Sequence, residues 1–343
     1  MVRVLYINVR EKNMNKSLGT YNIFDNKGIN KSIENVLKSN INFNTYTTPK
    51  GLKELRIEIS RFLDRTWNYK TSYNNMIITN GSQQSINIIS NSLIKDGDVV
   101  FMEQPTYFGA IDVFKKRNVK LIGIELLENG LNLEELERKI IQYSPKLIYV
   151  VTTFNNPTGY SWSTNNREEF LQIINRYNIL VLEDDPYSFI NFTKTKYKSL
   201  YNLNKGRNII YLGTFSKLIS PSINVGYILS DKVDILYSYK KSFDLCTSAF
   251  LQYVVLDYLK NNDLNKVLKL KIKKYKNLLK KSIRKLNSNY KNRIEYYSNP
   301  KGGLFYLVKF KEKIREEEFE DGSNYFITKK ANNITRINIC SEL

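Results

Sequence analysis

From about residue 75 to residue 229, short and continuously apolar runs alternate with longer segments that mix apolar and polar residues at helical spacing. The apolar runs are MIIT (76–79), VVFM (99–102), VKLIGIEL (119–126), KLIYVVT (146–152), ILVLED (179–184), NIIYLG (208–213) and GYILS (226–230). Helix candidates between them cover 83–93, 109–117, 133–143 and 166–177. Continuous apolar strands separated by helices are typical of a parallel sheet covered on both faces. The pattern predicts an α/β fold, a three-layer α/β/α domain around a mainly parallel seven-stranded sheet.

After residue 231 the pattern changes to long helical segments and then to a strand-rich tail, with GGLFYLVKF (302–310) and TRINIC (335–340). A chain of 343 residues can bury a sizeable core and is long enough for two parts. We expect a large domain over 41–260 and an abbreviated small α+β domain built from 1–40 and 261–343.

Several classes of site and location are excluded or disfavoured by composition. The sequence has no histidine, which excludes His-dependent triads and His-ligated metals. Its two cysteines, Cys246 and Cys340, lie far apart and match no disulfide or metal framework. No run approaches the roughly 20 apolar residues of a membrane span, and the first residues lack a secretory signal pattern. We therefore expect a cytoplasmic protein without a metal site or a membrane partner.

The formal net charge is +20, which is compatible with a nucleic-acid or anionic-surface binder. It is equally compatible with a bias towards Lys, Asn and Ile throughout the chain. Lysines concentrate in 266–285, but their spacing spreads them around a helix whose apolar positions supply the buried side. We favour a solvated helix face and do not expect a nucleic-acid partner.

Four turns follow predicted strands at their carboxyl ends, where open α/β sheets bind ligands. They are TNGSQQ (79–84), EQPTYFG (103–109), FNNPTG (154–159) and EDDPY (183–187). A fifth stretch, YLGTFSK (211–217), sets Lys217 among hydroxyls at a strand end. Lysine is seldom buried without a partner or a covalent role. Lys217 is therefore a candidate for Schiff-base chemistry.

Pyridoxal phosphate binds a lysine in this way and also needs an acid against its ring nitrogen. Asp184 ends a buried strand, and Tyr187, three residues on, can reach the neighbouring ring hydroxyl. Because Asp184 and Asp185 are adjacent, one of them is expected only to cap a turn, and the spacing to Tyr187 selects Asp184 as the acid.

The phosphate dianion of this cofactor also needs hydrogen-bond donors, and the cofactor ring needs an aromatic side chain against its face. The helix start GSQQSINII (81–89) offers backbone N–H groups through Gly81, Ser82 and Gln83. Tyr107 follows a strand at a place where its ring can lie over a cofactor. The candidate acid, the tyrosine, the lysine and the phosphate-binding turn thus all lie at strand ends of one sheet.

In this order the motifs resemble those of the fold type I pyridoxal-phosphate aminotransferases of class I and II. The resemblance is strongest to the branch of 2-aminoadipate and aromatic aminotransferases, which also supplies the domain fused to winged-helix repressors. It covers roughly residues 44–343 and rests on YTTPKGLKELR (46–56), GSQQSINIISNSLIKDGDVVFMEQPTYFGA (81–110), FNNPTGYSWS (154–163), ILVLEDDPYSF (179–189) and YLGTFSK (211–217).

The resemblance implies an enzyme that moves an amino group from an L-amino acid to a 2-oxo acid through a lysine aldimine, with 41–260 as the cofactor-binding domain. It makes Lys217, Asp184 and Tyr187 catalytic. It implies that the cofactor is held by Gly81, Ser82, Gln83, Tyr107, Asn156, Asp184, Tyr187, Thr214, Ser216 and Lys217. Tyr46 would reach the phosphate of a partner subunit, which implies a homodimer with shared active sites. Arg336, with Asn156, would grip the substrate carboxylate through a bidentate guanidinium.

Three departures from the family pattern concern activity. Asn224 stands where the family usually has a phosphate-binding arginine. The N-terminal segment is short and lacks a glycine- and proline-rich loop, and the C-terminal part is abbreviated. Two alternatives therefore stay open: another reaction of the same cofactor, such as elimination, decarboxylation or oxidation, and a non-catalytic module that binds cofactor or amino acid. We expect no helix-turn-helix region before residue 44. The sequence does not predict which amino acid is the substrate.

Overall fold

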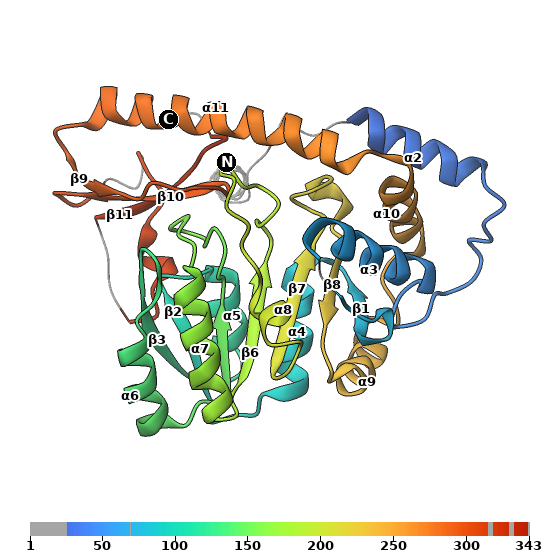
Figure 1. Ribbon diagram of the computed structural model, residues 1–343, viewed down its shortest axis with the longest axis horizontal. Coiled ribbons are helices and arrows are strands. Elements are labelled where there is room, and N and C mark those ends of the chain that lie inside the picture. Colours follow the sequence, from blue (N-terminus) through green and yellow to red (C-terminus); the bar gives the residue numbers. More distant parts are fainter. Residues whose placement is uncertain (1–25, 69, 315–317, 329–332, 342–343) are drawn as a thin grey trace, which may run out of the picture.

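Two sheets organise the protein in the computed structural model, which describes residues 26–68, 70–314, 318–328 and 333–341 (Figure 1). The strands of the large sheet are β1 (Met76–Thr79), β2 (Val99–Gln104), β3 (Lys120–Leu127), β4 (Gly130–Leu131), β5 (Leu147–Val150), β6 (Leu180–Asp185), β7 (Ile209–Thr214) and β8 (Gly226–Leu229). The small sheet contains β9 (Ile294–Tyr297), β10 (Phe305–Phe310) and β11 (Ile334–Asn338). The N-terminal part of the predicted small domain, residues 1–25, lies outside the described residues.

The large sheet has the strand order β1-β8-β7-β6-β5-β2-β3-β4. All seven predicted strands form, and the sheet is mainly parallel, with β8 antiparallel to both of its neighbours. The predicted strand number of seven was wrong by one, because β4 adds an antiparallel pair at the edge beside β3. A strand of two residues leaves no apolar run in the sequence, so no sequence pattern predicted β4.

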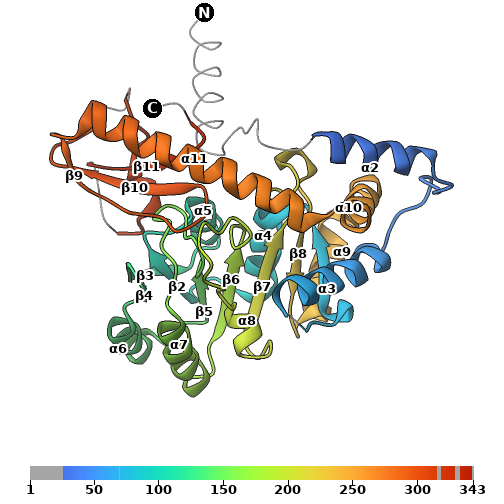
Figure 2. The ribbon, with the colours of Figure 1, turned by 45° about the horizontal axis from the view of Figure 1, so that its top comes forward.

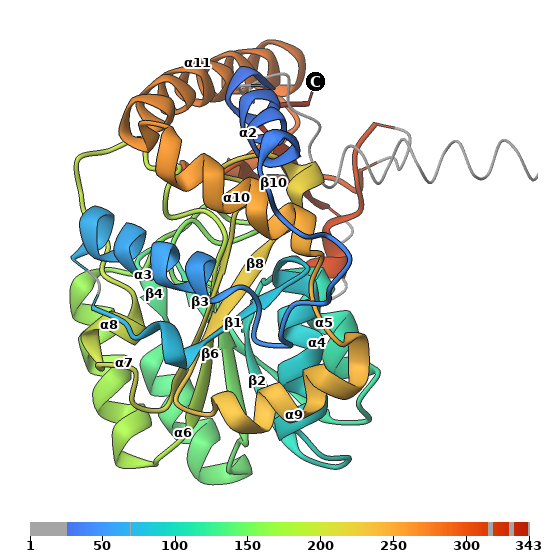
Figure 3. The same ribbon diagram turned by 90° about the vertical axis from the view of Figure 1, so that its right-hand side faces the viewer.

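Helices cover both faces of this sheet and make the predicted three layers (Figure 3). One face carries α3 (Lys53–Trp67), α6 (Leu133–Tyr143), α7 (Thr164–Arg176), α8 (Leu200–Leu203) and α10 (Ala249–Asn261). The other carries α4 (Gly81–Leu93), α5 (Phe108–Lys115) and α9 (Val233–Asp244). Strand residues alternate between the two cores: Ile77 packs on one side and Ile78 on the other. This alternation is the two-residue period of a strand that is buried on both faces.

The small sheet is antiparallel, in the order β11-β10-β9, and the long helix α11 (Leu264–Tyr290) lies along it (Figures 1 and 2). Tyr275, Leu279 and Leu286 of α11 are buried in a third core with the β10 side chains. The other end of α11 leads back to α10, beside which α2 (Asn26–Lys38) packs. The helix therefore links the small sheet to the large one.

The lysine-rich stretch forms α11, with most of its lysines exposed, as a solvated face requires: Lys266, Lys269, Lys273, Lys274, Lys276, Lys280, Lys281 and Lys285. Lys271 is the exception, since it is buried. Among the described residues, no helix is long and apolar enough to cross a membrane.

Beneath the strand ends, the buried guanidinium of Arg167 on α7 joins several chain segments. Its N–H groups make hydrogen bonds of 2.7–3.2 Å to the carbonyl oxygens of Thr152, Trp162 and Lys198 and to the hydroxyls of Thr152 and Thr153. Glu183 lies 3.9 Å from the guanidinium and accepts the backbone N–H groups of Leu200 and Tyr201. Burial lowers the pKa of Arg167 and raises the pKa of Glu183, and each charge opposes the shift of the other. Charged groups this deep are stable only as a fully bonded set.

We predict that Arg167→Met lowers the free energy of unfolding by about 3–5 kcal/mol, because it leaves a buried carboxylate without its cation. The control is Arg176→Met on the same helix, which breaks an ion pair between the largely exposed Arg176 and Glu137; surface pairs contribute only about 0–1 kcal/mol. Urea unfolding followed by circular dichroism measures both. Equal losses in the two variants would contradict the prediction.

Candidate active site

The turns at the carboxyl ends of the parallel strands enclose an open pocket with a cavity volume of about 200 Å³. Because β8 is antiparallel, its beginning lies at the same edge and adds Asn224. The small sheet closes the opposite side. The lining residues are Ser82, Gln83, Tyr107, Phe108, Val151, Asn156, Asp184, Pro186, Tyr187, Thr214, Ser216, Lys217, Asn224, Phe305 and Arg336.

Lys217 lies in a tight turn directly after β7, and its side chain lines the pocket. Burial and, to a smaller extent, the nearby cation Arg336 lower the pKa of its amine to about 8, while Cys340 acts in the opposite direction. An ordinary lysine amine is almost wholly protonated near neutral pH. Lys217 therefore has a usable fraction of neutral, nucleophilic amine.

Asp184 lies at the end of β6 and is 3% exposed. One carboxylate oxygen accepts the Tyr149 hydroxyl at 2.8 Å, whereas the other, Oδ1, has no hydrogen-bond partner among the described residues. Burial raises the pKa of Asp184 to about 7; the bond from Tyr149 lowers it, and the neighbouring Asp185 raises it. A buried carboxylate oxygen that borders a pocket in this way is suited to a ligand with an N–H or O–H donor.

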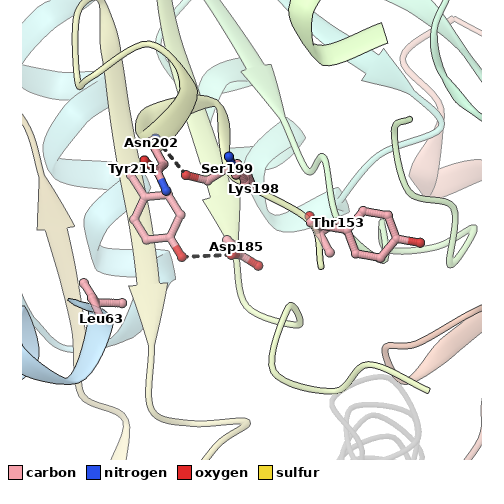
Figure 4. Close-up of a pocket in the computed structure, with 8 residues that line it drawn as sticks. Leu63, Thr153, Asp185, Lys198, Ser199, Asn202 and Tyr211 are labelled. Atoms are coloured by element: carbon pink, nitrogen blue, oxygen red, sulfur yellow. Dashed lines mark hydrogen bonds between the residues drawn. The ribbon is translucent and has the colours of Figure 1, made fainter. Parts of the chain in front are cut away.

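The next residue, Asp185, points towards Tyr211 and, as expected, caps a turn (Figure 4). It accepts the Tyr211 hydroxyl at 2.8 Å and the backbone N–H of Ser188 at 3.0 Å. The hollow that it borders has a cavity volume of about 20 Å³, close to that of one water molecule. The structure thus separates the two aspartates and leaves only Asp184 facing the large pocket.

The N-terminus of α4 faces the pocket at a second point. The Ser82 hydroxyl is buried and has no partner among the described residues. Gly81 has a φ of +74°, and a Cβ at Gly81 would lie 2.3 Å from the side-chain oxygen of Asn224, so the turn requires glycine. Gln83 donates to the Gly109 carbonyl and accepts the Tyr107 hydroxyl at 3.1 Å. Together with the helix dipole, these groups make a place for an anion.

Further hydroxyls lie across from this helix end. Thr214 accepts the backbone N–H of Ser216, and their hydroxyls are 3.2 Å apart. Both line the pocket. The hydroxyl pair adds donors on a side of the pocket where Asn224 contributes no charge.

Arg336 comes from β11 of the small sheet and is 4% exposed. Its guanidinium lies over the Phe305 ring, 4.1 Å from the centroid, and donates to the side-chain oxygen of Asn156 at 3.2 Å and to Glu320 at 3.2 Å. A guanidinium held on its face by an aromatic ring presents its edges to a carboxylate.

The structure brings nearly all predicted site residues into this one pocket. Gly81 only shapes the turn beside it, and Tyr46 does not line it, since its side chain is 86% exposed. Sequence analysis missed Phe108, Val151, Pro186 and Phe305. Phe108 and Pro186 lie within predicted turns and Val151 within a predicted strand, but only the pairing of β10 with β11 places Phe305 beside Arg336.

Comparison with known proteins agrees with this arrangement. The chain matches the family "aminotransferase class I and II" over residues 14–341. It is 28% identical over 270 residues to aromatic-amino-acid aminotransferase 1 of Thermococcus litoralis, which is 76% of this chain and 64% of that one. It is 28% identical over 235 residues to 2-aminoadipate transaminase of Thermus thermophilus, which is 67% of this chain and 59% of that one. The chain thus spans less than two thirds of the length of these two relatives.

Among solved structures, kynurenine aminotransferase of Pyrococcus horikoshii superposes with a TM-score of 0.85 at 28% identity, covering 93% of this chain and 83% of that one. The match to the family extends over almost all described elements, including the strand-end turns and the small sheet. The protein belongs to the class I and II aminotransferases.

Proposed function

We propose that the protein is a pyridoxal-phosphate-dependent aminotransferase that moves an amino group from an L-amino acid to a 2-oxo acid. The observation that supports this most is a pair of groups in one pocket: the amine of Lys217, with a pKa of about 8, and Oδ1 of buried Asp184, for which the described residues provide no hydrogen-bond partner. The pocket residues fit this cofactor. The Pyrococcus relative was solved in complex with PMP.

In this proposal Lys217 holds the cofactor covalently through its amine, and Asp184 accepts a hydrogen bond from the ring nitrogen. Ser82, the N–H groups at the start of α4, and the hydroxyls of Thr214 and Ser216 hold the phosphate. When bound, the cofactor supplies an electron sink for the substrate's alpha carbon. Tyr107 covers the ring, and Tyr187 and Asn156 donate to its hydroxyl oxygen.

Lys217 also has the role of moving a proton at the substrate's alpha carbon. A group that transfers protons in both directions works best when its pKa lies near the working pH, and burial brings the amine of Lys217 into that range. Arg336 binds the alpha-carboxylate with Asn156. We further propose a large cofactor domain over 41–260 and a small domain, from 1–40 and 261–343, that provides Arg336.

The lining of the pocket also suggests a substrate class. Tyr107, Phe108 and Phe305 give it aromatic walls. Among the described residues, the cations that line it are Lys217 and Arg336, so a second substrate carboxylate finds no cation there. We propose L-amino acids with aromatic or large apolar side chains.

The test is a transamination assay with purified protein, added pyridoxal phosphate and a panel of amino donors against 2-oxoglutarate and pyruvate. We expect 2-oxo acid formation that is fastest with aromatic and large apolar donors and is abolished by Lys217→Ala. A cofactor spectrum that shifts with amino acids but yields no 2-oxo acid would favour a binding module. Ammonia, carbon dioxide or peroxide as products would indicate elimination, decarboxylation or oxidation.

Asn224 leads to a second prediction, about cofactor affinity. Asn224→Arg should tighten binding of pyridoxal phosphate by about tenfold, because a charge-assisted hydrogen bond to phosphate is worth roughly 1.5–3 kcal/mol. Part of that gain is offset, since residue 224 has a φ of +43°, where asparagine is better tolerated than arginine. Quenching of protein fluorescence on titration of the apo-protein measures the dissociation constant.

The control for this substitution is Asn224→Gln, which lengthens the side chain without adding a charge. It should bind the cofactor no more tightly than the wild type. If Asn224→Arg binds more weakly than Asn224→Gln, another cation already serves the phosphate or the phosphate lies elsewhere.

We also propose a homodimer. Large apolar side chains are exposed in one region: Phe43 (43%), Tyr46 (86%), Phe243 (50%) and Leu245 (58%). Phe43 packs on the rings of Phe250 and Tyr253 at the start of α10, which Leu245 precedes in the chain. Asp244, between Phe243 and Leu245, accepts hydrogen bonds from Asn80 and Gln84 at the start of α4. A partner on this patch would have its Tyr46 near the phosphate end of the pocket.

Sedimentation velocity tests the dimer. Leu245→Asp should give monomers at micromolar concentration and weaken cofactor binding, because a charge replaces buried apolar surface at an interface. Ile141→Asp, a similar change at a 69% exposed position of α6, should remain dimeric. A wild type that sediments as a monomer at every concentration contradicts the proposal.

A cytoplasmic location is the setting we propose, in keeping with two free cysteines.

A further inference from the structure

Lys271 breaks the pattern of α11. The buried positions of this helix recur at spacings of three, four or seven residues: Leu264, Lys271, Tyr275, Leu279, Ser282 and Leu286. A lysine thus stands where the helix period requires an apolar residue. It is 4% exposed, whereas the other lysines of α11 face solvent.

The ammonium of Lys271 reaches the turn that carries Lys217. It donates to the carbonyl oxygens of Leu218 and Ile219, the two residues that follow Lys217. Both are almost fully buried, at 2% and 1% exposure. The turn is a single helical turn, closed by the bond from the Ile219 N–H to the Phe215 carbonyl at 2.7 Å.

A helical turn ends in carbonyl oxygens that point along its axis and lack partners within the turn. Water cannot satisfy them here because Leu218 and Ile219 are buried. A cation at this end both bonds the carbonyls and matches the sign of the local dipole. Lys271 therefore fixes the backbone on which the Lys217 side chain stands.

The same helix is bound to the small sheet, which carries Arg336. Eleven residues beyond Lys271, the Ser282 hydroxyl lies 2.8 Å from the Tyr306 hydroxyl of β10, and β10 pairs with β11. Eleven residues of helix span about 16 Å. One rigid element thus contacts the turn of Lys217 at one point and the sheet of Arg336 at another.

We propose that Lys271 is a positioning residue, which holds the Lys217 turn against α11. It thereby fixes the position of the Lys217 amine relative to Arg336 and keeps water away from that amine. The catalytic meaning of this rests on the proposed function, but the effect on Lys217 belongs to the apo-protein. The groups near the Lys217 amine are Asp184, Tyr187 and Tyr107 from the large sheet and its turns, and Arg336 and Cys340 from β11 and its end.

The test labels the apo-protein with a trace of acetic anhydride between pH 6 and pH 11 and quantifies acetylation of Lys217 by peptide mapping. In the wild type the labelling midpoint should lie near the pKa of about 8. In Lys271→Met the turn loosens and water reaches the amine, so the main cause of the low pKa weakens and the midpoint rises. Labelling of Lys217 at pH 8 should fall about fivefold to tenfold, which corresponds to a rise of roughly one pH unit.

Lys276→Met is the matched control. Lys276 lies on the same helix and donates to the Phe192 carbonyl at 2.9 Å, but it does not touch the Lys217 turn, so its loss should leave the midpoint unchanged. Lys271→Arg keeps a cationic donor and should restore most of the wild-type midpoint.

An unchanged Lys217 midpoint in Lys271→Met overturns the proposal, whatever that variant does to thermal stability. If Lys271→Met does not fold, Lys271→Ala, which also removes every donor from this position but is smaller, is titrated in the same way, and an unchanged midpoint there has the same meaning. Because the labelling needs no cofactor, its outcome is independent of whether the protein transaminates. A failed transamination assay alone would contradict the proposed function and leave the labelling result standing.

Discussion

Below the pocket, one buried guanidinium, that of Arg167, holds together the chain segments that lead to Asn156 and Asp184. Arg167 bonds the chain just after β5 and the loop that leads to α8, and Glu183, the residue before Asp184, lies against it. Glu103 of β2 extends this hydrogen-bonded set. Its carboxylate accepts hydrogen bonds from the Trp162 indole N–H, the Asn155 side-chain amide and the Val151 backbone N–H. Burial raises the pKa of Glu103 to about 7, against the lowering effect of these donors. Because this hydrogen-bonded set fixes the strand ends, Asn156 and Asp184 keep their positions without a bound ligand.

In the pocket above Arg167, burial shifts the pKa values of an acid and a base towards neutral pH from opposite directions. The acid Asp184 has a pKa raised to about 7, and the base Lys217 has a pKa lowered to about 8. Both shifts have desolvation by burial as their largest cause. Such displaced pairs are typical of functional sites. At the anion end the arrangement differs, because hydroxyls, N–H groups and a helix dipole act without a cation from Asn224.

What the sequence could predict was local. A strand and the turn that follows it are adjacent in the chain, so β1 and α6 agree with their predicted bounds to the residue, and the strand-end turns do meet at one edge. β9 was missed because IEYY is only partly buried and has no apolar run. Phe305 was missed because its contact with Arg336 depends on strand pairing. Lys271 could have been found, since the helical period places it on the apolar stripe, but its acceptors depend on tertiary packing.

The order of these residues along the chain has a consequence for biosynthesis. The large-sheet residues that line the pocket and are proposed to hold the cofactor lie between Ser82 and Asn224, whereas Arg336, the proposed carboxylate ligand, comes later, on β11. Domains of larger proteins tend to fold as units during synthesis, the N-terminal part first. A ribosome-bound chain would therefore contain all of these large-sheet residues more than a hundred codons (336 − 224 = 112) before Arg336 is added. Cofactor captured at that stage would stabilise the large sheet by mass action, so vitamin supply during translation would bear on how much protein matures.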